Sequence, residues 1–500
     1  MATQRATPAY DTLAGTWKKL HHFSHLQALA SWDRMSMMPS GGNAARAEAM
    51  AEMDGLLHSI RTDPQLRSYI DAAESEPLGD LDKANLREIR RDWRSANALP
   101  ADLVQRQSLA NATCEHAWRE QRPANDWQGF LENFRAVLKC SRAQAAFLSS
   151  ETGLKPYDAL MDFYEPGMTS EKLDVLFDDL LTWLPDLVRK VRLKQASQNV
   201  LPPVGPFSRA AQHAVGLEVM TLLGFDFNAG RLDESAHPFC GGVPEDTRLT
   251  TRYRDDDFVG SLMGTIHETG HGRYEQSLPR DLLGQPVAWA RSAGIHESQS
   301  LSFEMQIGLS RAFVGLMAPA IVKHFGTQPA FDAENLYQHL IRVQPNFIRV
   351  EADELTYPLH VILRYRIERD LIEGRVEAED IPDVWDKAMA ELLDVDTCGN
   401  YKNGCMQDVH WAEGLFGYFP SYTLGAMYAA QWFAGIRRQV PDFDTRMAFG
   451  ELHLAFDWLK TNIWAHGSRL TTEELVIRAT GTPLDATHYR RHLETRYLGD

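Results

Sequence analysis

The chain has 500 residues, a hydrophobic fraction of 44% and a formal net charge of −17 at pH 7. This length and composition can bury a large core, and helical enzymes of this size often form one body around a cleft, so we expect a single domain over residues 1–500. The acidic charge argues against nucleic acid and anionic membranes as main partners, and no apolar run is long enough to span a bilayer.

Cysteine usage and the N-terminal stretch bear on the cellular compartment. The five cysteines are scattered, odd in number and without a Cys-x-x-Cys spacing. They predict reduced thiols rather than a disulfide framework or a zinc site. Residues 1–19 also lack the apolar region of a secretory signal peptide. We therefore expect a cytoplasmic protein.

Helical patterns dominate the first part of the chain. Residues 8 to about 150 are expected to be helical almost throughout, with a clear apolar face over residues 127–138. The stretch 157–168, YDALMDFYEPGM, ends in a Pro-Gly turn signal. Further helices are expected from residue 170 onward and over residues 208–224.

Residues 230–254 change character. The segments 231–235 and 247–254 alternate weakly in polarity and carry threonine and tyrosine, with prolines and glycines between them. This pattern predicts a small antiparallel strand pair. A strand edge at this place could bind an extended peptide through main-chain hydrogen bonds.

The next stretch carries the strongest chemical signal, a His-Glu-x-x-His motif at residues 267–271. Apolar residues at helical spacing and three aspartates precede it, and Pro279 follows, so it is expected on a helix. His267 and His271 then share one face and can hold one metal ion. Glu268 can reach a water on that metal and take its proton. The alternative is a pair of solvated or core histidines.

The remainder of the chain is predicted to be helical. Helices are expected over residues 289–312, 333–344, 354–373, 381–394, 422–438 and 444–464, and Thr471 to Glu474 form a capping box for a helix near the end of the chain. The fold class is therefore expected to be mainly α, with one small antiparallel sheet beside the zinc helix.

A catalytic zinc site needs a third protein ligand from another element. Glu297 lies on the next predicted helix. Many acids could serve, however, so spacing alone does not select it.

Six separate motifs resemble those of the carboxypeptidase Taq family of metallocarboxypeptidases, in the family's order and over most of the chain. They are HPF at 237–239, DTRLT at 246–250, HETGH at 267–271, HESQ at 296–299, IRVEAD at 348–353 and GCMQDVHW at 404–411. The resemblance implies a cytoplasmic, often dimeric enzyme that releases single amino acids from peptide C-termini. It also implies a helical, zincin-like body with a deep substrate groove, one wall of which is formed by residues 1–150.

The resemblance also implies the composition of the metal site. One divalent ion per chain, zinc first and cobalt or manganese as alternatives, would be held by His267, His271 and Glu297, with Glu268 as general base. Glu304 is the first alternative to Glu297. Gln407 and Asp408 could orient the zinc ligands through hydrogen bonds.

A carboxypeptidase must recognise a free α-carboxylate, for which arginine offers a bidentate fork. Arg349, in the IRVEAD motif, is the candidate. The alternative is a structural pairing of Arg349 with Glu351 or Asp353. Asp246 and Arg248 belong to a motif associated in the family with closing the groove and limiting substrate length. The alternative for them is a structural salt bridge.

The tetrahedral intermediate of peptide hydrolysis needs hydrogen-bond donors for its oxyanion. Tyr418 and Tyr422 resemble the tyrosines of related zinc peptidases, and either could donate. His237 and His410 are further candidates to line the groove. Each could instead be a satisfied core histidine.

Three functions compete at this point. The leading interpretation is a metal-dependent carboxypeptidase, expected as a homodimer, that acts on peptides with a free C-terminus. The second is an oligoendopeptidase with the same zinc chemistry and an open groove. The third is a non-catalytic peptide-binding protein of the same fold, against which the intact Glu268 and Glu297 argue.

Overall fold

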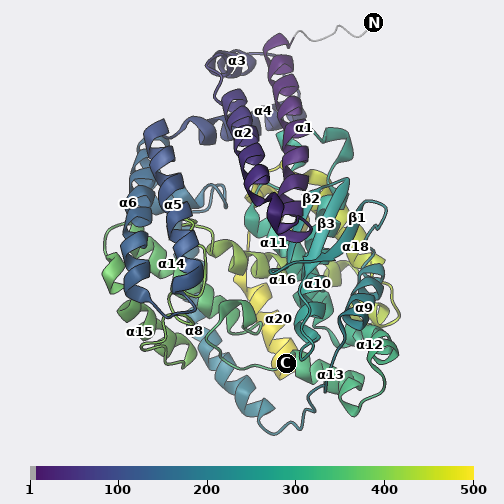
Figure 1. The fold of residues 1–500 in the computed structure, drawn as a ribbon. Helices are drawn as coiled ribbons and strands as arrows, with labels where there is room; N and C mark the ends of the chain where they lie inside the picture. The colour runs from purple at the N-terminus through teal and green to yellow at the C-terminus, as the bar shows by residue number, and fades with distance from the viewer. Residues whose placement is uncertain (1–6, 500) are drawn as a thin grey trace, which may run out of the picture.

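The computed structural model describes residues 7–499 (Figure 1). Residues 1–6 and 500 of the expected domain lie outside the described part. The prediction of a nearly continuous helical region up to residue 150 is confirmed. Its helices are α1 (Pro8–Ser36), α2 (Asn43–Arg61), α3 (Gln65–Ala73), α4 (Asp80–Asn97), α5 (Ala101–Gln121) and α6 (Trp127–Thr152).

The N-terminal helices divide between two apolar cores. Helices α1 to α4 pack around a small cluster that includes Leu13, Trp17 and Ile89, and they lie at the top of Figure 1. Helix α6 instead contributes to the main core through Phe130 and Phe134, on the apolar face expected from the sequence. Cys114 of α5 is also part of the main core, so the break between the two cores falls before α5.

The expected sheet is present, but its predicted pairing is wrong. It has three strands, β1 (Gly230–Glu234), β2 (Phe239–Val243) and β3 (Asp246–Thr251), in the order β1-β3-β2. Strands β1 and β3, expected to be antiparallel, pair in parallel, and β2 is antiparallel to β3. The sequence hid β2 because glycine is depleted in strands. Here Gly242, at φ 86°, lies so close to the Asp246 carbonyl that a side chain would clash.

Three helices connect the N-terminal region to the motif helix: α7 (Pro156–Met161), α8 (Ser170–Gln195) and α9 (Arg209–Leu222). The motif helix is α10 (Val259–Ser277). At its start the Asp257 carboxylate accepts the Gly260 N–H at 3.1 Å. The helix ends two residues before Pro279. The prediction of this helix is confirmed, and it lies between β3, α9 and the following helix.

Two long helices predicted beyond α10 are interrupted. Residues 289–312 form α11 (Ala293–Leu301), a π-helical turn (Ser302–Gly308) and the start of α12 (Arg311–Phe325). Residues 444–464 contain the end of α17 (Phe443–Ala448), then α18 (His453–Asn462), because Gly450 between them adopts φ 84°. The remaining helices are α13 (Ala333–Leu340), α14 (Tyr357–Ile372), α15 (Ile381–Leu393), α16 (Pro420–Gln439), α19 (Thr472–Thr480), with the expected capping box, and α20 (Ala486–Leu498).

Within residues 7–499, no single helix has the length and apolar character to cross a membrane. One bent pair, Pro286–Gly308 with Arg311–Phe325, meets the length and composition criteria only when the two helices are taken together.

Candidate metal centre

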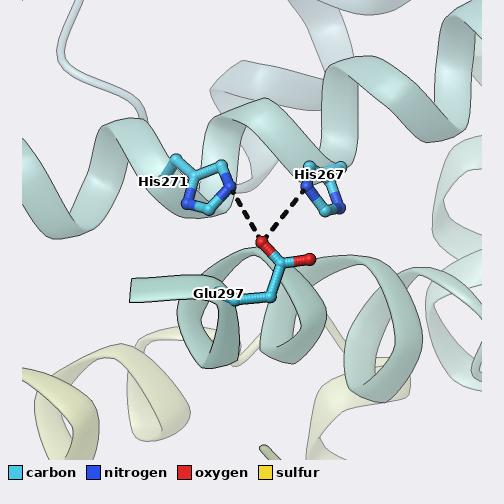
Figure 2. A group of neighbouring side chains, drawn as sticks. All are labelled: His267, His271 and Glu297. Carbon is cyan, nitrogen blue, oxygen red and sulfur yellow. Dashed lines mark ion pairs between the residues drawn. The ribbon is translucent and has the colours of Figure 1, made fainter. Parts of the chain in front are cut away.

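Three side chains from two helices converge on one point (Figure 2). His267 and His271 on α10 both turn Nε2 toward the Glu297 carboxylate on α11. Glu297 Oε2 lies 3.4 Å from His271 Nε2 and 3.9 Å from His267 Nε2. The three ligand atoms lie within 4.8 Å of one another, in the one such cluster of histidine, cysteine and acidic side chains found among residues 7–499.

The donor set of this cluster fits a divalent metal ion. Two imidazole nitrogens and one carboxylate oxygen are the ligands of many catalytic zinc sites, where a fourth position stays open. The Nε2 atoms of both histidines point toward the Glu297 carboxylate. His271 Nδ1 is buried without a hydrogen-bond partner. The residues expected as ligands from the sequence are therefore brought together.

The electrostatics of the cluster also favour a cation. Burial alone would lower the pKa of His267, but the Glu297 and Glu304 carboxylates raise it to about 10. Burial and the neighbouring His296 instead lower the pKa of His271 to about 4. Burial opposes the ionisation of Glu297, yet the histidines, His267 foremost, bring its pKa down to about 2. A field that holds a proton on His267 also favours a metal ion beside it.

Glu304 lies behind His267 and not among the three converging groups. Its Oε2 is 2.7 Å from His267 Nδ1. This contact orients the imidazole so that Nε2 faces Glu297. The π-helical turn that carries Glu304 is a geometry often found at functional sites.

Glu268 has the environment of a proton acceptor that operates near neutral pH. It is 7% exposed. Burial raises its pKa to about 7, with the Glu297 and Glu304 charges adding to the rise and His267 opposing it. A general base is most effective when its pKa is close to the working pH.

Two glycines set the spacing of the helices around Glu297. A Cβ atom on Gly270 of α10 would lie 2.5 Å from the Gln299 carbonyl oxygen of α11. A Cβ atom on Gly425 of α16 would lie 2.7 Å from Glu297 Cγ. Helix α11 is therefore held closely between α10 and α16, and the stem of Glu297 has little freedom to move.

We expect Gly425→Ala to weaken metal binding. The added methyl group would overpack α16 against the stem of Glu297, at a cost of about 1–3 kcal/mol in stability. The control is Gly435→Ala on the same helix, where the new Cβ would meet Trp458 at 3.0 Å instead. Competitive titration with a chelator should show lower affinity only for Gly425→Ala. Equal affinities in the two variants would contradict the role given to this contact.

Arg349 is buried in an ion pair that differs from the one expected as its alternative role. Its side chain is 4% exposed. Nε and Nη2 donate to Asp408 Oδ1 at 3.2 and 2.8 Å, and Nη1 donates to the Tyr357 hydroxyl at 2.6 Å. The suggested structural partners, Glu351 and Asp353, are therefore wrong, because Asp408 takes that place.

The GCMQDVHW motif supports Arg349 and not the metal ligands, so the hypothesis that Gln407 and Asp408 orient those ligands is wrong. Gln407 Oε1 accepts the Arg349 N–H at 2.8 Å, and its amide donates to backbone carbonyls. Asp408 accepts from Arg364 Nε at 2.7 Å as well as from Arg349. The two arginines hold the pKa of Asp408 well below its usual range in spite of burial.

The candidate oxyanion donors and one candidate histidine lie beside Arg349. The ring of Tyr422 is 4.8 Å from the Arg349 guanidinium and 5.3 Å from the ring of Tyr418. His410 Nε2 is 3.2 Å from the Tyr422 hydroxyl, and burial lowers the pKa of His410 to about 4. Burial, with a contribution from the Glu297 charge, raises the pKa of Tyr418 to about 12. The structure therefore brings these groups together.

The other three candidates lie at the sheet. Asp246 and Arg248 form a salt bridge on β3, with Nε at 2.9 Å and Nη2 at 2.7 Å from the two carboxylate oxygens. The Arg248 guanidinium lies 4.7 Å from the ring centroid of Trp32 on α1. His237 is exposed just before β2. The salt bridge that was the structural alternative for Asp246 and Arg248 is present.

Tyr357 and Arg364 are site neighbours that the sequence reasoning missed. Both bond to the Arg349–Asp408 pair, and both lie on α14. They are separated by two helical turns and therefore share one face. Their spacing within the helix predicted over residues 354–373 was the available signal.

Known metallopeptidases resemble this chain in sequence and in fold. A model of the carboxypeptidase Taq (M32) metallopeptidase family matches residues 12–497. The chain is 38% identical to thermostable carboxypeptidase 1 of Thermus thermophilus over 98% of each chain. It is 33% identical to carboxypeptidase 1 of Bacillus subtilis over 96% of each chain. The solved structure of Trypanosoma cruzi metallocarboxypeptidase 1 is similar with a TM-score of 0.97 and 46% identity, covering 98% of this chain and 100% of that one.

Proposed function

Because the chain belongs to the carboxypeptidase Taq (M32) metallopeptidase family and is a metallocarboxypeptidase, we propose that the cluster of Figure 2 is its metal site and Glu268 its general base. The convergence of two imidazoles and one carboxylate is the observation that carries this proposal. Zinc is the metal we propose, because this donor set suits it, with cobalt or manganese as alternatives.

The residues around the metal site suit peptide hydrolysis. When bound, a divalent metal supplies Lewis-acid chemistry that polarises a carbonyl and acidifies water. Glu268, with a pKa near 7, accepts the proton of the attacking water and passes it to the leaving amine. Tyr418 and Tyr422 keep their protons at neutral pH, since burial raises both hydroxyl pKa values, and either can donate to the oxyanion.

The charge around Arg349 supports recognition of a free C-terminus. Two buried arginines, Arg349 and Arg364, share the single Asp408 carboxylate, so this bonded group carries one excess positive charge. A buried charge without a partner is costly. The α-carboxylate of a peptide would balance it. We therefore place the substrate carboxylate at Arg349, with His410 beside it and His237, Asp246 and Arg248 as more distant groove contacts.

We expect Arg349→Ala to erase the preference for a free carboxylate. A charge-assisted hydrogen bond contributes about 1.5–3 kcal/mol, so kcat/KM for a free-acid peptide should fall at least about tenfold. The C-terminally amidated peptide of the same sequence, which has no carboxylate, should be cut at nearly its former slow rate. Steady-state kinetics on the peptide pair, with metal content as control, measures the ratio.

The control for this experiment is Arg349→Lys, which keeps the charge and loses the fork. It should retain part of the acid preference, because lysine binds a carboxylate as a point charge. If both rates fall together in Arg349→Ala and the acid-to-amide ratio stays at the wild-type value, Arg349 has only a structural role.

Several wider expectations are part of the same proposal. We propose a single-domain cytoplasmic homodimer that acts on peptides, without nucleic-acid or membrane partners, and in which the N-terminal helices form one wall of the groove. The net charge of −17 and the unbridged cysteines support it. Light scattering of the purified protein tests the dimer.

A further inference from the structure

The YDALMDFYEPGM stretch, residues 157–168, connects to the proposed metal site from behind. The sequence marked it only as a turn. Its Glu165 is 2% exposed, although a buried carboxylate is expensive without partners. Burial raises the pKa of Glu165, while hydrogen bonds from Ser292 and Gly294 oppose that rise. These hydrogen bonds therefore compensate for the burial of the Glu165 carboxylate.

The Glu165 carboxylate binds the start of α11, the helix that carries Glu297. Its Oε2 accepts the Ser292 hydroxyl proton at 2.7 Å, and its Oε1 accepts the Gly294 N–H. The approach is so close that a Cβ atom on Gly294 would lie 2.8 Å from Oε1. Glycine at this position thus permits the contact.

The neighbouring backbone completes the same cap. The Tyr164 carbonyl accepts the Ala293 N–H at 2.8 Å, and Ser292 Oγ accepts the Ile295 N–H at 3.0 Å. The first three N–H groups of α11 are consequently all bonded, by the 164–165 turn or by the serine that Glu165 holds. Such groups have no partner within their own helix, and a carboxylate is favourable at this end of the helix dipole.

The position of Glu297 depends on this cap. Helix α11 begins at Ala293 and continues directly into the π-helical turn, so the cap fixes the start of the helical segment that carries Glu297, where the N–H groups have no partner within the helix. Glu297 follows Gly294 by about one turn, so a shift of the first turn displaces its carboxylate. Oε2 of that carboxylate lies 3.4 Å from His271 Nε2.

We propose that Glu165 is a positioning residue of the metal centre, which fixes the first turn of α11 and so holds Glu297 against the two histidines. This inference rests on the proposed role of Glu297 as a metal ligand. Tyr164 connects the same turn to Tyr418, the candidate oxyanion donor, because the two rings meet edge-on with their centroids 5.0 Å apart.

The test is the Zn²⁺ affinity of the full-length protein, measured by competition with a chromophoric chelator. Glu165→Ala should raise the Kd at least about tenfold, as does loss of other groups that orient metal ligands. Glu165→Gln should stay within about threefold of wild type, because its amide can still accept from Gly294 and donate to Ser292. The absorption spectrum of the Co²⁺-loaded protein should change in Glu165→Ala and be restored in Glu165→Gln.

The matched control is Asp158→Ala in the same stretch. Asp158 is also buried, and its Oδ1 accepts the Ser170 N–H at 2.7 Å at the start of α8, which carries none of the proposed ligands. This variant should lower the melting temperature without changing the Zn²⁺ Kd. If Glu165→Ala behaves in the same way, the inference is overturned.

Two further variants keep the outcome decisive. If Glu165→Ala does not fold, Ser292→Ala removes one contact of the cap and should still raise the Zn²⁺ Kd; a wild-type Kd in that variant overturns the inference. Glu297→Ala separates the two proposals. Unchanged affinity there refutes the ligand assignment itself, whereas lost affinity there with a wild-type Kd in Glu165→Ala refutes only the positioning role.

Discussion

Glu268→Gln is expected to retain the metal and to lose nearly all turnover. The amide has the size of the carboxylate but cannot accept a proton, and loss of a general base typically costs about 10²–10⁴-fold in rate. The three proposed ligands are untouched, so metal content should match wild type. Steady-state rates on a free-acid peptide, with metal analysis of the same samples, measure both quantities.

Glu268→Asp is the matched variant for this experiment. It keeps a carboxylate but withdraws it by one methylene, so we expect a rate between those of Glu268→Gln and wild type. Activity of Glu268→Gln within tenfold of wild type, at unchanged metal content, would remove Glu268 as the base.

Glu297→Ala is expected to abolish tight metal binding. It removes one of only three protein ligands and leaves His267 and His271 to hold the ion alone. The loss of affinity should exceed the roughly 10–100-fold effect of changing a group that merely orients a ligand. Dialysis against a mild chelator followed by metal analysis reveals it.

Glu304→Gln provides the comparison, because Glu304 touches His267 Nδ1 from behind. It should weaken binding by about 10–100-fold, and therefore less than Glu297→Ala. The reverse order, with the ion retained in Glu297→Ala, would make Glu304 the ligand instead.

The metal helix could be predicted from the sequence because its signals are local. Apolar spacing, aspartates at its start and Pro279 at its end all lie within one short stretch, and the structure places α10 there. The third ligand, Glu297, could not be predicted from local signals in this way. Its spacing selected no particular acid, and only the family resemblance singled it out before the structure placed it against His271.

The features that sequence reasoning missed depend on long-range contacts. The partner of Arg349 is Asp408, far along the chain, whereas local reasoning offered Glu351 and Asp353. No local sequence pattern predicts the π-helical turn that directs Glu304 at His267. Strand β2 was hidden by its two glycines, one of which, Gly242, lies in close contact with the Asp246 carbonyl of β3.

As a metallocarboxypeptidase, this protein should remove residues one at a time from a free C-terminus. The most direct test is time-resolved mass spectrometry of a peptide and its C-terminally amidated twin, incubated with the metal-loaded enzyme. We expect a ladder of products from the free acid, each one residue shorter at the C-terminus, with the amide cut far more slowly and no products after chelation. Internal fragments, or equal cleavage of the two peptides, would contradict it.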